Sequence, residues 1–450
     1  MEEVSEASSH ETQKLVKLQE LPEKTSEVAK GIELLLNDPR DVVLILIIGF
    51  LDSIGYTIFL SIIPIYLVDV WDTGDFRAGL VYGTVGVLSG VYSFVVGTYP
   101  RKIGYFRCLV LGALLVGLGY LGLAFALNYF MVMLLLYTLI PLGNALVAPL
   151  IIFSLKLYVH PDSRAISNTL VVLAYRVGII IEGIVISIFW STISDLEWTY
   201  TSIFICAASV YFLIAFVRLF LRQPKFEVEK EEGKSVEYSE IFEGKRIWRL
   251  IGVQFLLLVV YSSTLIFFLG FIPIYMTREF GEDTNWGFVV TVFASVSIVS
   301  LVGLSSFMFL QSAYSWITLG CFVMSASISL LILPPAYGLC ILAALVLAVG
   351  NTLEAPRVYD YILEVAPKGQ EAFYLSTNSI HMTVSSLMSG IIGGLLIDEF
   401  CPEEGERNSW VMWLVLSCFG FLGAFVLFFG KSCLEEPDQS RRPLLSCKSN

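Results

Sequence analysis

The sequence predicts an all-α membrane protein with 12 transmembrane helices in two parallel, pseudo-symmetric six-helix bundles. Composition is the first reason, because 56% of the 450 residues are hydrophobic and only 15% are charged, unlike a soluble domain. The second is a succession of apolar runs of the length that spans a bilayer as a helix. The third is an internal repeat. Since helices satisfy all their backbone groups inside each span, the runs predict a helical bundle.

The apolar runs follow one another along most of the chain. The first reads VVLILIIGFLDSIGYTIFLSIIPIYL, from Val42 to Leu67. A charged segment, RQPKFEVEKEEGKSVEYSEIFEGKR from Arg222 to Arg246, separates six runs from the next six, and its charge excludes a membrane span. The expected spans are 42–67, 78–99, 108–127, 129–155, 169–190, 200–220, 249–275, 286–309, 313–333, 336–362, 373–397 and 409–430.

These spans divide the chain into five regions. Two of them are the six-helix bundles, and the other three are polar segments that we expect on the cytoplasmic side. The regions are a tail expected to be disordered (1–40), the N-terminal bundle (41–220), the charged linker (221–248), the C-terminal bundle (249–430) and a second tail (431–450).

The distribution of Lys and Arg predicts that both termini are cytoplasmic. Short cytoplasmic loops of membrane proteins carry the excess of positive charge. With the N-terminus inside, the opposite loops carry only Arg77, Arg278 and Arg407. The cytoplasmic side then holds the linker's basic residues and Arg101, Lys102, Arg107, Lys156, Arg164 and Lys368.

Two short motifs recur at nearly one offset. GNALVAP, starting at Gly143, returns as GNTLEAP at Gly350, which is 207 residues later. IPIY, starting at Ile63, returns at Ile272, which is 209 residues later. The motifs fall in spans four and ten and in spans one and seven, so they indicate an internal repeat. Because spans one and seven begin on the same side, the repeats are parallel, about an axis along the membrane normal.

The loop between spans two and three carries a recognisable motif. GTYPRKIGYFR, from Gly97 to Arg107, resembles the signature Gly-x-x-x-Asp-[Arg/Lys]-x-Gly-x-[Arg/Lys]-[Arg/Lys] of the major facilitator superfamily. Two positions depart from it, since Arg101 stands where the family has Asp and Phe106 occupies a basic position. The resemblance covers Val42 to Gly430 and implies the family's fold and a gating role for this loop. The gating-loop residues are Gly97, Arg101, Lys102, Gly104 and Arg107.

Charged side chains inside the spans are the candidate functional residues. Such a charge costs about 2.5 to 3.5 kcal/mol even on the insertion scales, so it usually faces a cavity or a partner. A structural ion pair or hydrogen bond between helices is the plainer alternative for each one. The candidates for a substrate or proton pathway are Asp52, Arg176, Glu182, Glu354, Arg357 and Asp360.

Helical spacing separates these candidates into pairs. Arg176 and Glu182 are six residues apart, so they point in different directions and we expect no pair between them. Arg357 and Asp360 are three apart and share one face of their helix. The two embedded arginines, one in each half, suit a solute with a carboxylate or phosphate, because guanidinium presents a planar fork to such groups.

These features predict a secondary transporter that moves a small polar solute, anionic or zwitterionic, by alternating access, with proton coupling. Two alternatives stay open, namely a facilitative uniporter of the same fold and a non-transporting receptor or assembly partner. An enzyme is not expected, because no nucleophile with a base, phosphate loop or metal cluster can be found. We also expect no cofactor, no metal and no nucleic-acid partner.

The expected partners are the solute, protons and the lipid bilayer, and we expect a monomer. The C-terminal SRRPLLSCKSN resembles a dileucine sorting signal of endolysosomal membrane proteins, although Ser440 occupies the position of its usual acidic residue. The protein is therefore expected in the plasma membrane or an endolysosomal membrane.

Overall fold

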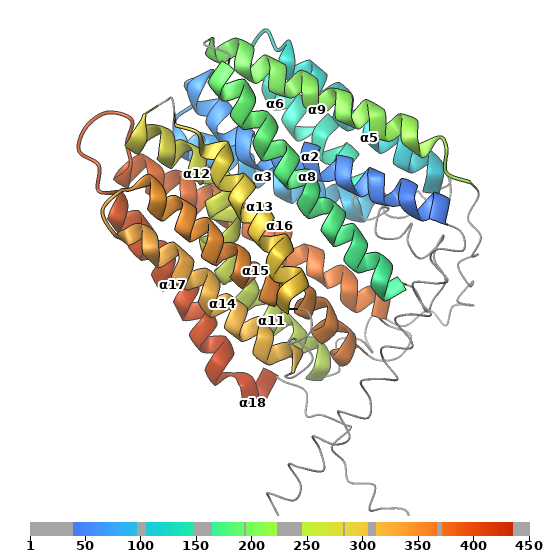
Figure 1. The fold of residues 1–450 in the computed structure, drawn as a ribbon, viewed down its shortest axis with the longest axis vertical. Helices are drawn as coiled ribbons and strands as arrows, with labels where there is room; N and C mark the ends of the chain where they lie inside the picture. Colours follow the sequence, from blue (N-terminus) through green and yellow to red (C-terminus); the bar gives the residue numbers. More distant parts are fainter. Residues whose placement is uncertain are drawn as a thin grey trace, which may run out of the picture.

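The computed structural model describes residues 39–96, 105–147, 164–192, 195–222, 245–281, 284–304, 312–366 and 371–434. The regular elements within these ranges are helices (Figure 1). In the first half they are α2 (Pro39–Asp69), α3 (Asp75–Val96), α5 (Tyr105–Ala124), α6 (Tyr129–Tyr137), α8 (Arg164–Thr192) and α9 (Leu196–Arg218). In the second half they are α11 (Lys245–Ser263), α12 (Leu265–Phe280), α13 (Trp286–Leu304), α14 (Ala313–Ser329), η2 (Leu330–Ile332), α15 (Tyr337–Val365), α16 (Glu371–Phe400), α17 (Ser409–Phe429) and α18 (Lys431–Leu434).

The helices confirm a polytopic all-α membrane protein. Among the described residues, 11 helical stretches are long and apolar enough to cross a membrane, with α6 continuing to Val147 and α11 and α12 together forming one stretch. α3 is not one of the 11, but its 22 residues would extend about 33 Å at 1.5 Å per residue. Together with α3, these 11 helical stretches correspond one to one to the 12 expected spans.

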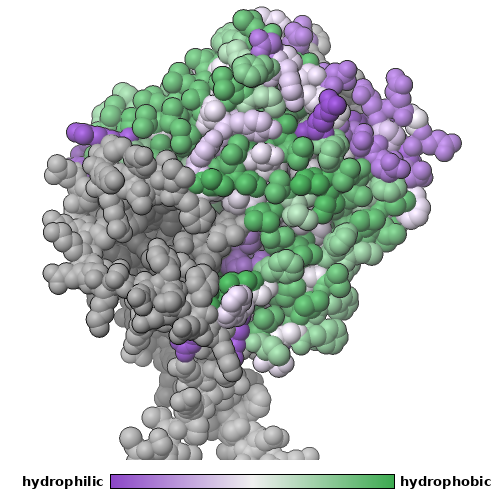
Figure 2. All heavy atoms as spheres, turned by 180° about the vertical axis from the view of Figure 1, so that it is seen from behind, coloured by the Kyte–Doolittle hydropathy of each residue, from purple (hydrophilic) through white to green (hydrophobic). Residues whose placement is uncertain are grey.

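Apolar side chains cover the flank of the bundle, as a lipid-facing surface requires (Figure 2). Hydrophobic colour spreads over most of the coloured part of the face shown, and hydrophilic residues gather at its upper right edge. Several large apolar side chains are half or more exposed, among them Phe255, Val299, Leu422 and Phe429. A face of this kind is stable in lipid and would aggregate in water.

The first-half and second-half helices form two groups that lie side by side in Figure 1. They meet where α3 packs along α16, where α8 packs along α13, and where α2 contacts α12. Glycines allow this close approach, because a Cβ added at Gly183 would lie 2.8 Å from the Gly287 carbonyl oxygen. A Cβ at Gly79 would lie 2.2 Å from the Gly390 carbonyl oxygen. Small residues at helix crossings are typical of membrane bundles.

The repeated motif packs in the same way in both halves. Gly143 lies against α5, where an added Cβ would be 2.7 Å from the Gly112 carbonyl oxygen. Gly350 lies against α14, where an added Cβ would be 3.0 Å from the Gly320 carbonyl oxygen. The equivalent contacts support the internal repeat inferred from the sequence. The division into five regions stays a prediction, since the tails and the linker lie mostly outside the described residues.

The seventh span is not the single continuous helix that the sequence suggested. It is interrupted at Thr264, whose backbone has φ −121° and ψ −88°. Hydroxyl groups bond the carbonyl oxygens around the break, including Thr264 to Val260 at 2.6 Å and Ser263 to Val259 at 2.8 Å. Side-chain hydroxyls of this kind satisfy backbone groups that an interrupted membrane helix would otherwise leave open.

Candidate functional site

Five polar side chains, which lie well inside their membrane-spanning stretches, are linked by contacts and by position, and we call them the central polar cluster. One comes from the first half, on α8, and four come from α11, α15 and α16 of the second half. They are Arg176, Tyr261, Asn351, Glu354 and His381. The cluster therefore crosses the interface between the halves at mid-depth, where transporters of repeat architecture hold their substrates.

Arg176 connects the two halves. Its Nη2 donates a hydrogen bond to Oδ1 of Asn351 on α15, and its guanidinium carbon lies 5.5 Å from the ring centroid of Phe293 on α13. Asn351 is buried. An amide oxygen bears only a partial charge, so a carboxylate would be a stronger acceptor for the same guanidinium.

Glu354 lies three residues after Asn351 and so on the same side of α15. It is fully buried, and its Oε2 accepts a hydrogen bond from the hydroxyl of Tyr261, just before the helix break at Thr264. The other carboxyl oxygen has no hydrogen-bond partner among the described residues. The Tyr261 ring stacks edge-on against the buried His381 of α16 at 5.5 Å. Glu354, Tyr261 and His381 thus form a chain of contacts. This chain lies beside Asn351, the residue that Arg176 binds.

Glu182 is a second fully buried carboxyl, on α8. Its Oε1 accepts a hydrogen bond from Ser61 of α2 at 3.1 Å, and its Oε2 bonds to no residue in the described part of the chain. As expected from the spacing, it does not pair with Arg176. Neither Glu182 nor Glu354 forms an ion pair with a described residue.

Asp52 occupies a different environment within the first half. Its Oδ2 accepts a hydrogen bond from Tyr175 at 2.7 Å. The first half holds another buried charge, Arg218, a fully buried residue at the end of α9. Arg218 donates one hydrogen bond to the Leu109 carbonyl, while its Nε and Nη2 bond to no described residue. Arg218 was not predicted, because it lies two residues before the end of the expected span six and resembles an interfacial residue.

The remaining predicted residues lie apart from the cluster or outside the described ranges. Arg357 and Asp360 form the expected ion pair at 2.6 Å, and the Asp360 side chain is 46% exposed, toward the end of α15. Of the five proposed gating-loop residues only Arg107 is described, and it is exposed near the start of α5. The other four, Gly97, Arg101, Lys102 and Gly104, lie outside the described residues.

A second connection between the halves lies at the distal end, by which we mean the end of the bundle where α3 begins and α12 ends. Arg278 binds both carboxylate oxygens of Asp75 at 2.8 Å and also donates to the Cys401 carbonyl at 2.7 Å. Both side chains are less than a tenth exposed. Arg407 in turn donates to the Arg278 carbonyl and to the Glu403 carbonyl at 2.9 Å. This bidentate pair joins the two halves at the distal end.

Removing either partner of the Asp75–Arg278 pair is expected to be costly. Breaking a buried ion pair from one side costs about 3 to 5 kcal/mol, because the other charge stays buried. We therefore expect Asp75→Asn and Arg278→Gln each to lower the thermal unfolding temperature in detergent. The charge-swapped double variant, Asp75→Arg with Arg278→Asp, is expected to recover part of the loss. If the swapped variant lowers the unfolding temperature by as much as the two single variants added together, the two charges are not coupled.

Comparisons with known proteins identify the family of this chain. The model of the Major Facilitator Superfamily matches residues 45–368, well over half of the chain. The chain belongs to the Major Facilitator Superfamily. A comparison with curated protein sequences gives no significant match.

Three solved structures with a similar fold are transporters. A POT family transporter in complex with a thioalcohol-conjugated peptide has a TM-score of 0.69 at 15% identity, covering 88% of this chain and 97% of its own. A D-xylose–proton symporter has a TM-score of 0.68 at 12% identity, covering 86% and 96%. A nucleoside transporter has a TM-score of 0.65 at 13% identity, covering 86% and 99%.

At this identity the likenesses establish the fold and not the substrate. Together with the family match they make this protein a multi-pass membrane transporter of the Major Facilitator Superfamily and not an enzyme. The sequence-based expectations of family, fold and transporter class are confirmed. The roles of individual residues remain predictions.

Proposed function

We propose that this Major Facilitator Superfamily protein is a proton-coupled secondary transporter of a small solute with a carboxylate or another anionic group. The observation that carries the proposal is the contact between Arg176 of one half and Asn351 of the other, near the middles of their helices. A solute carboxylate that replaced the Asn351 oxygen on Arg176 would gain a charge-assisted, forked interaction. Binding would then alter a contact that joins the two halves.

The proposed proton carriers are Glu354 and Glu182. Both are fully buried, and each has one carboxyl oxygen without a hydrogen-bond partner. Buried ionisable groups of transmembrane helices that lack an ion partner are typical of proton relays. Glu354 is preferred, because Asn351 connects its side of α15 to Arg176.

The other predicted residues receive subordinate roles in this proposal. Asp52 is assigned to electrostatic balance with Arg218 inside the first half. Arg357 and Asp360 are assigned to the pathway that the solute or proton takes between the central polar cluster and the end of α15. We further propose a monomer with both termini cytoplasmic, in the plasma membrane or an endolysosomal membrane.

The test is solute uptake into proteoliposomes with and without an imposed pH gradient. Carboxylates, amino acids and short peptides are the first solutes, with sugars and nucleosides as uncharged comparisons. We expect saturable uptake of an anionic or zwitterionic solute that a pH gradient accelerates and a protonophore slows. Saturable uptake whose rate does not depend on the pH gradient would instead indicate a facilitative uniporter. Saturable uptake of uncharged solutes alone would contradict the role of Arg176.

A further inference from the structure

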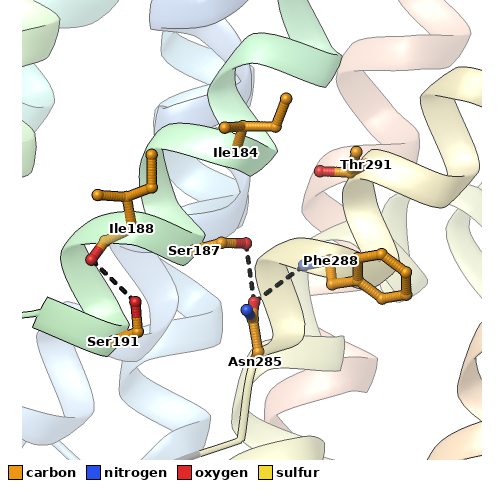
Figure 3. A pocket seen from close by; sticks show the side chains of 7 residues that line it. All are labelled: Ile184, Ser187, Ile188, Ser191, Asn285, Phe288 and Thr291. Carbon is orange, nitrogen blue, oxygen red and sulfur yellow. Dashed lines mark hydrogen bonds between the residues drawn. The ribbon is translucent and has the colours of Figure 1, made fainter.

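A groove opens on the flank of the bundle between α8 and α13, one helix from each half (Figure 3). Its lining alternates apolar and polar groups. The exposed apolar ones are Ile184, Ile188 and Phe288, at 41%, 53% and 46% exposure. The polar ones are Ser187, Ser191, Asn285 and Thr291. None of the described residues that line the groove is charged.

Asn285 is held in one orientation with its donor group uncommitted. Its Oδ1 accepts from the Phe288 backbone N–H at 3.1 Å and from the Ser187 hydroxyl at 2.8 Å, as the dashed lines in Figure 3 mark. A backbone N–H can only donate, so the atom it reaches must be the amide oxygen. The Nδ2 group, which carries two N–H donors, bonds to no described residue.

The free donor of the groove lies at its distal end. Asn285 immediately precedes α13 and Ser191 is next to the last residue of α8, so both lie at the distal end. Ile184 lies seven residues deeper on α8, about 10 Å along the helix axis, and Thr291 lies at a similar depth on α13. The Thr291 hydroxyl donates to the Gly287 carbonyl at 3.0 Å, so it needs no ligand. A ligand that fits must therefore present hydrogen-bond acceptors at the distal end, with hydrocarbon reaching deeper along the exposed apolar side chains.

We propose that this groove binds one glycerophospholipid of the distal leaflet. An ester carbonyl would accept hydrogen bonds from Nδ2 of Asn285, and an acyl chain would follow Ile188, Ile184 and Phe288. The ester region is rich in acceptors and carries no charge, which matches described lining residues that are uncharged and that include a free donor. The surrounding bilayer supplies this molecule at the depth where the groove lies.

A lipid in this position would favour one conformation of the transporter. It would contact α8 and α13 at once, beside the close approach of Gly183 to Gly287 that joins the halves. A ligand that binds one arrangement of the two halves better than another shifts the equilibrium by the difference in affinity. The bound lipid would thus stabilise the arrangement in which α8 and α13 pack together.

The test measures thermal unfolding of the delipidated protein in detergent while a diester phosphatidylcholine is titrated, beside its diether analogue, which lacks the carbonyls. A ligand that binds the folded protein raises the unfolding temperature saturably. We expect such a rise with the diester lipid and a weaker one with the diether. Asn285→Asp keeps the oxygen that caps α13 and removes the donors, so it should raise the half-saturating lipid concentration about three- to tenfold.

Ser209→Leu is the matched control, because Ser209 is an exposed serine on α9 whose hydroxyl bonds its own helix, away from the groove. It should leave the lipid response unchanged. The proposal is overturned if Asn285→Asp responds like the wild type, if diester and diether act equally, if a sterol gives the same saturable rise, or if Ser209→Leu loses the response as Asn285→Asp does.

Discussion

Uptake of the anionic solute is expected to fall about a hundredfold when Arg176 is replaced by glutamine. A hydrogen bond to a charged group contributes about 1.5 to 3 kcal/mol, and losing the guanidinium leaves the solute's charge buried without a partner. Glutamine retains a polar side chain that can still reach Asn351, so the helices should remain in place. The measurement is the initial rate of saturable uptake into proteoliposomes of the first solute that binds.

Two variants make this result interpretable. Arg176→Lys keeps the charge but loses the fork, so its rate should lie between wild type and Arg176→Gln. Arg357→Gln removes the other embedded arginine, which is paired with Asp360 on its own helix. We expect it to cost less than about tenfold, since an intrahelical pair contributes little. The reverse ranking of the two arginines would move the anion site away from the central polar cluster.

Concentrative uptake driven by a pH gradient is expected to disappear in Glu354→Gln, while exchange of labelled for unlabelled solute continues. Glutamine has the same shape and can still accept the hydrogen bond from Tyr261, but it cannot take up and release a proton. The measurement compares accumulation under a gradient with counterflow in the same proteoliposomes. The loss of one activity without the other distinguishes coupling from binding.

Glu182→Gln is the matched comparison, because Glu182 is equally buried and also has one carboxyl oxygen without a partner. If Glu354 carries the proton, Glu182→Gln should retain part of the gradient-driven uptake. Full accumulation by Glu354→Gln would contradict its role. Loss of accumulation in Glu182→Gln alone would transfer that role to the interface of α2 and α8.

The sequence was sufficient for the fold because the membrane imposes strong rules on composition and helix length. Apolar runs located all 12 spans, and short motifs revealed the repeat. It missed the break at Thr264, since hydroxyl side chains in an apolar run do not by themselves indicate an interrupted helix. Helix ends also moved, with α8 beginning at Arg164, before its apolar run.

The central polar cluster was only half predictable. Embedded charges identified Arg176 and Glu354, but their partners Asn351 and Tyr261 are uncharged and lie 175 and 93 residues away. One signal was available for Tyr261. The offset of 209 residues between the IPIY motifs makes Tyr261 the repeat equivalent of Asp52. Asp52 and Tyr261 each form a hydrogen bond with a residue of another helix. A comparison of the two halves would therefore have suggested Tyr261 as a candidate.

The distal pair was not predictable, because Asp75 and Arg278 lie outside the apolar runs and resemble ordinary loop residues. Their burial arises only when α3 and α12 of different halves meet. The gating role of the loop from Gly97 to Arg107 stays a prediction, since most of that loop lies outside the described residues.

The central claim is that Arg176 binds the anionic group of the solute between the two halves. The most direct measurement is a thermal-shift screen of the purified protein against amino acids, peptides, carboxylates, sugars and nucleosides, with Arg176→Gln and Arg357→Gln beside it. A bound solute raises the unfolding temperature by mass action. We predict stabilisation by a carboxylate or zwitterion that Arg176→Gln loses and Arg357→Gln retains. Equal stabilisation of Arg176→Gln and wild type, or stabilisation by uncharged solutes alone, would contradict the claim.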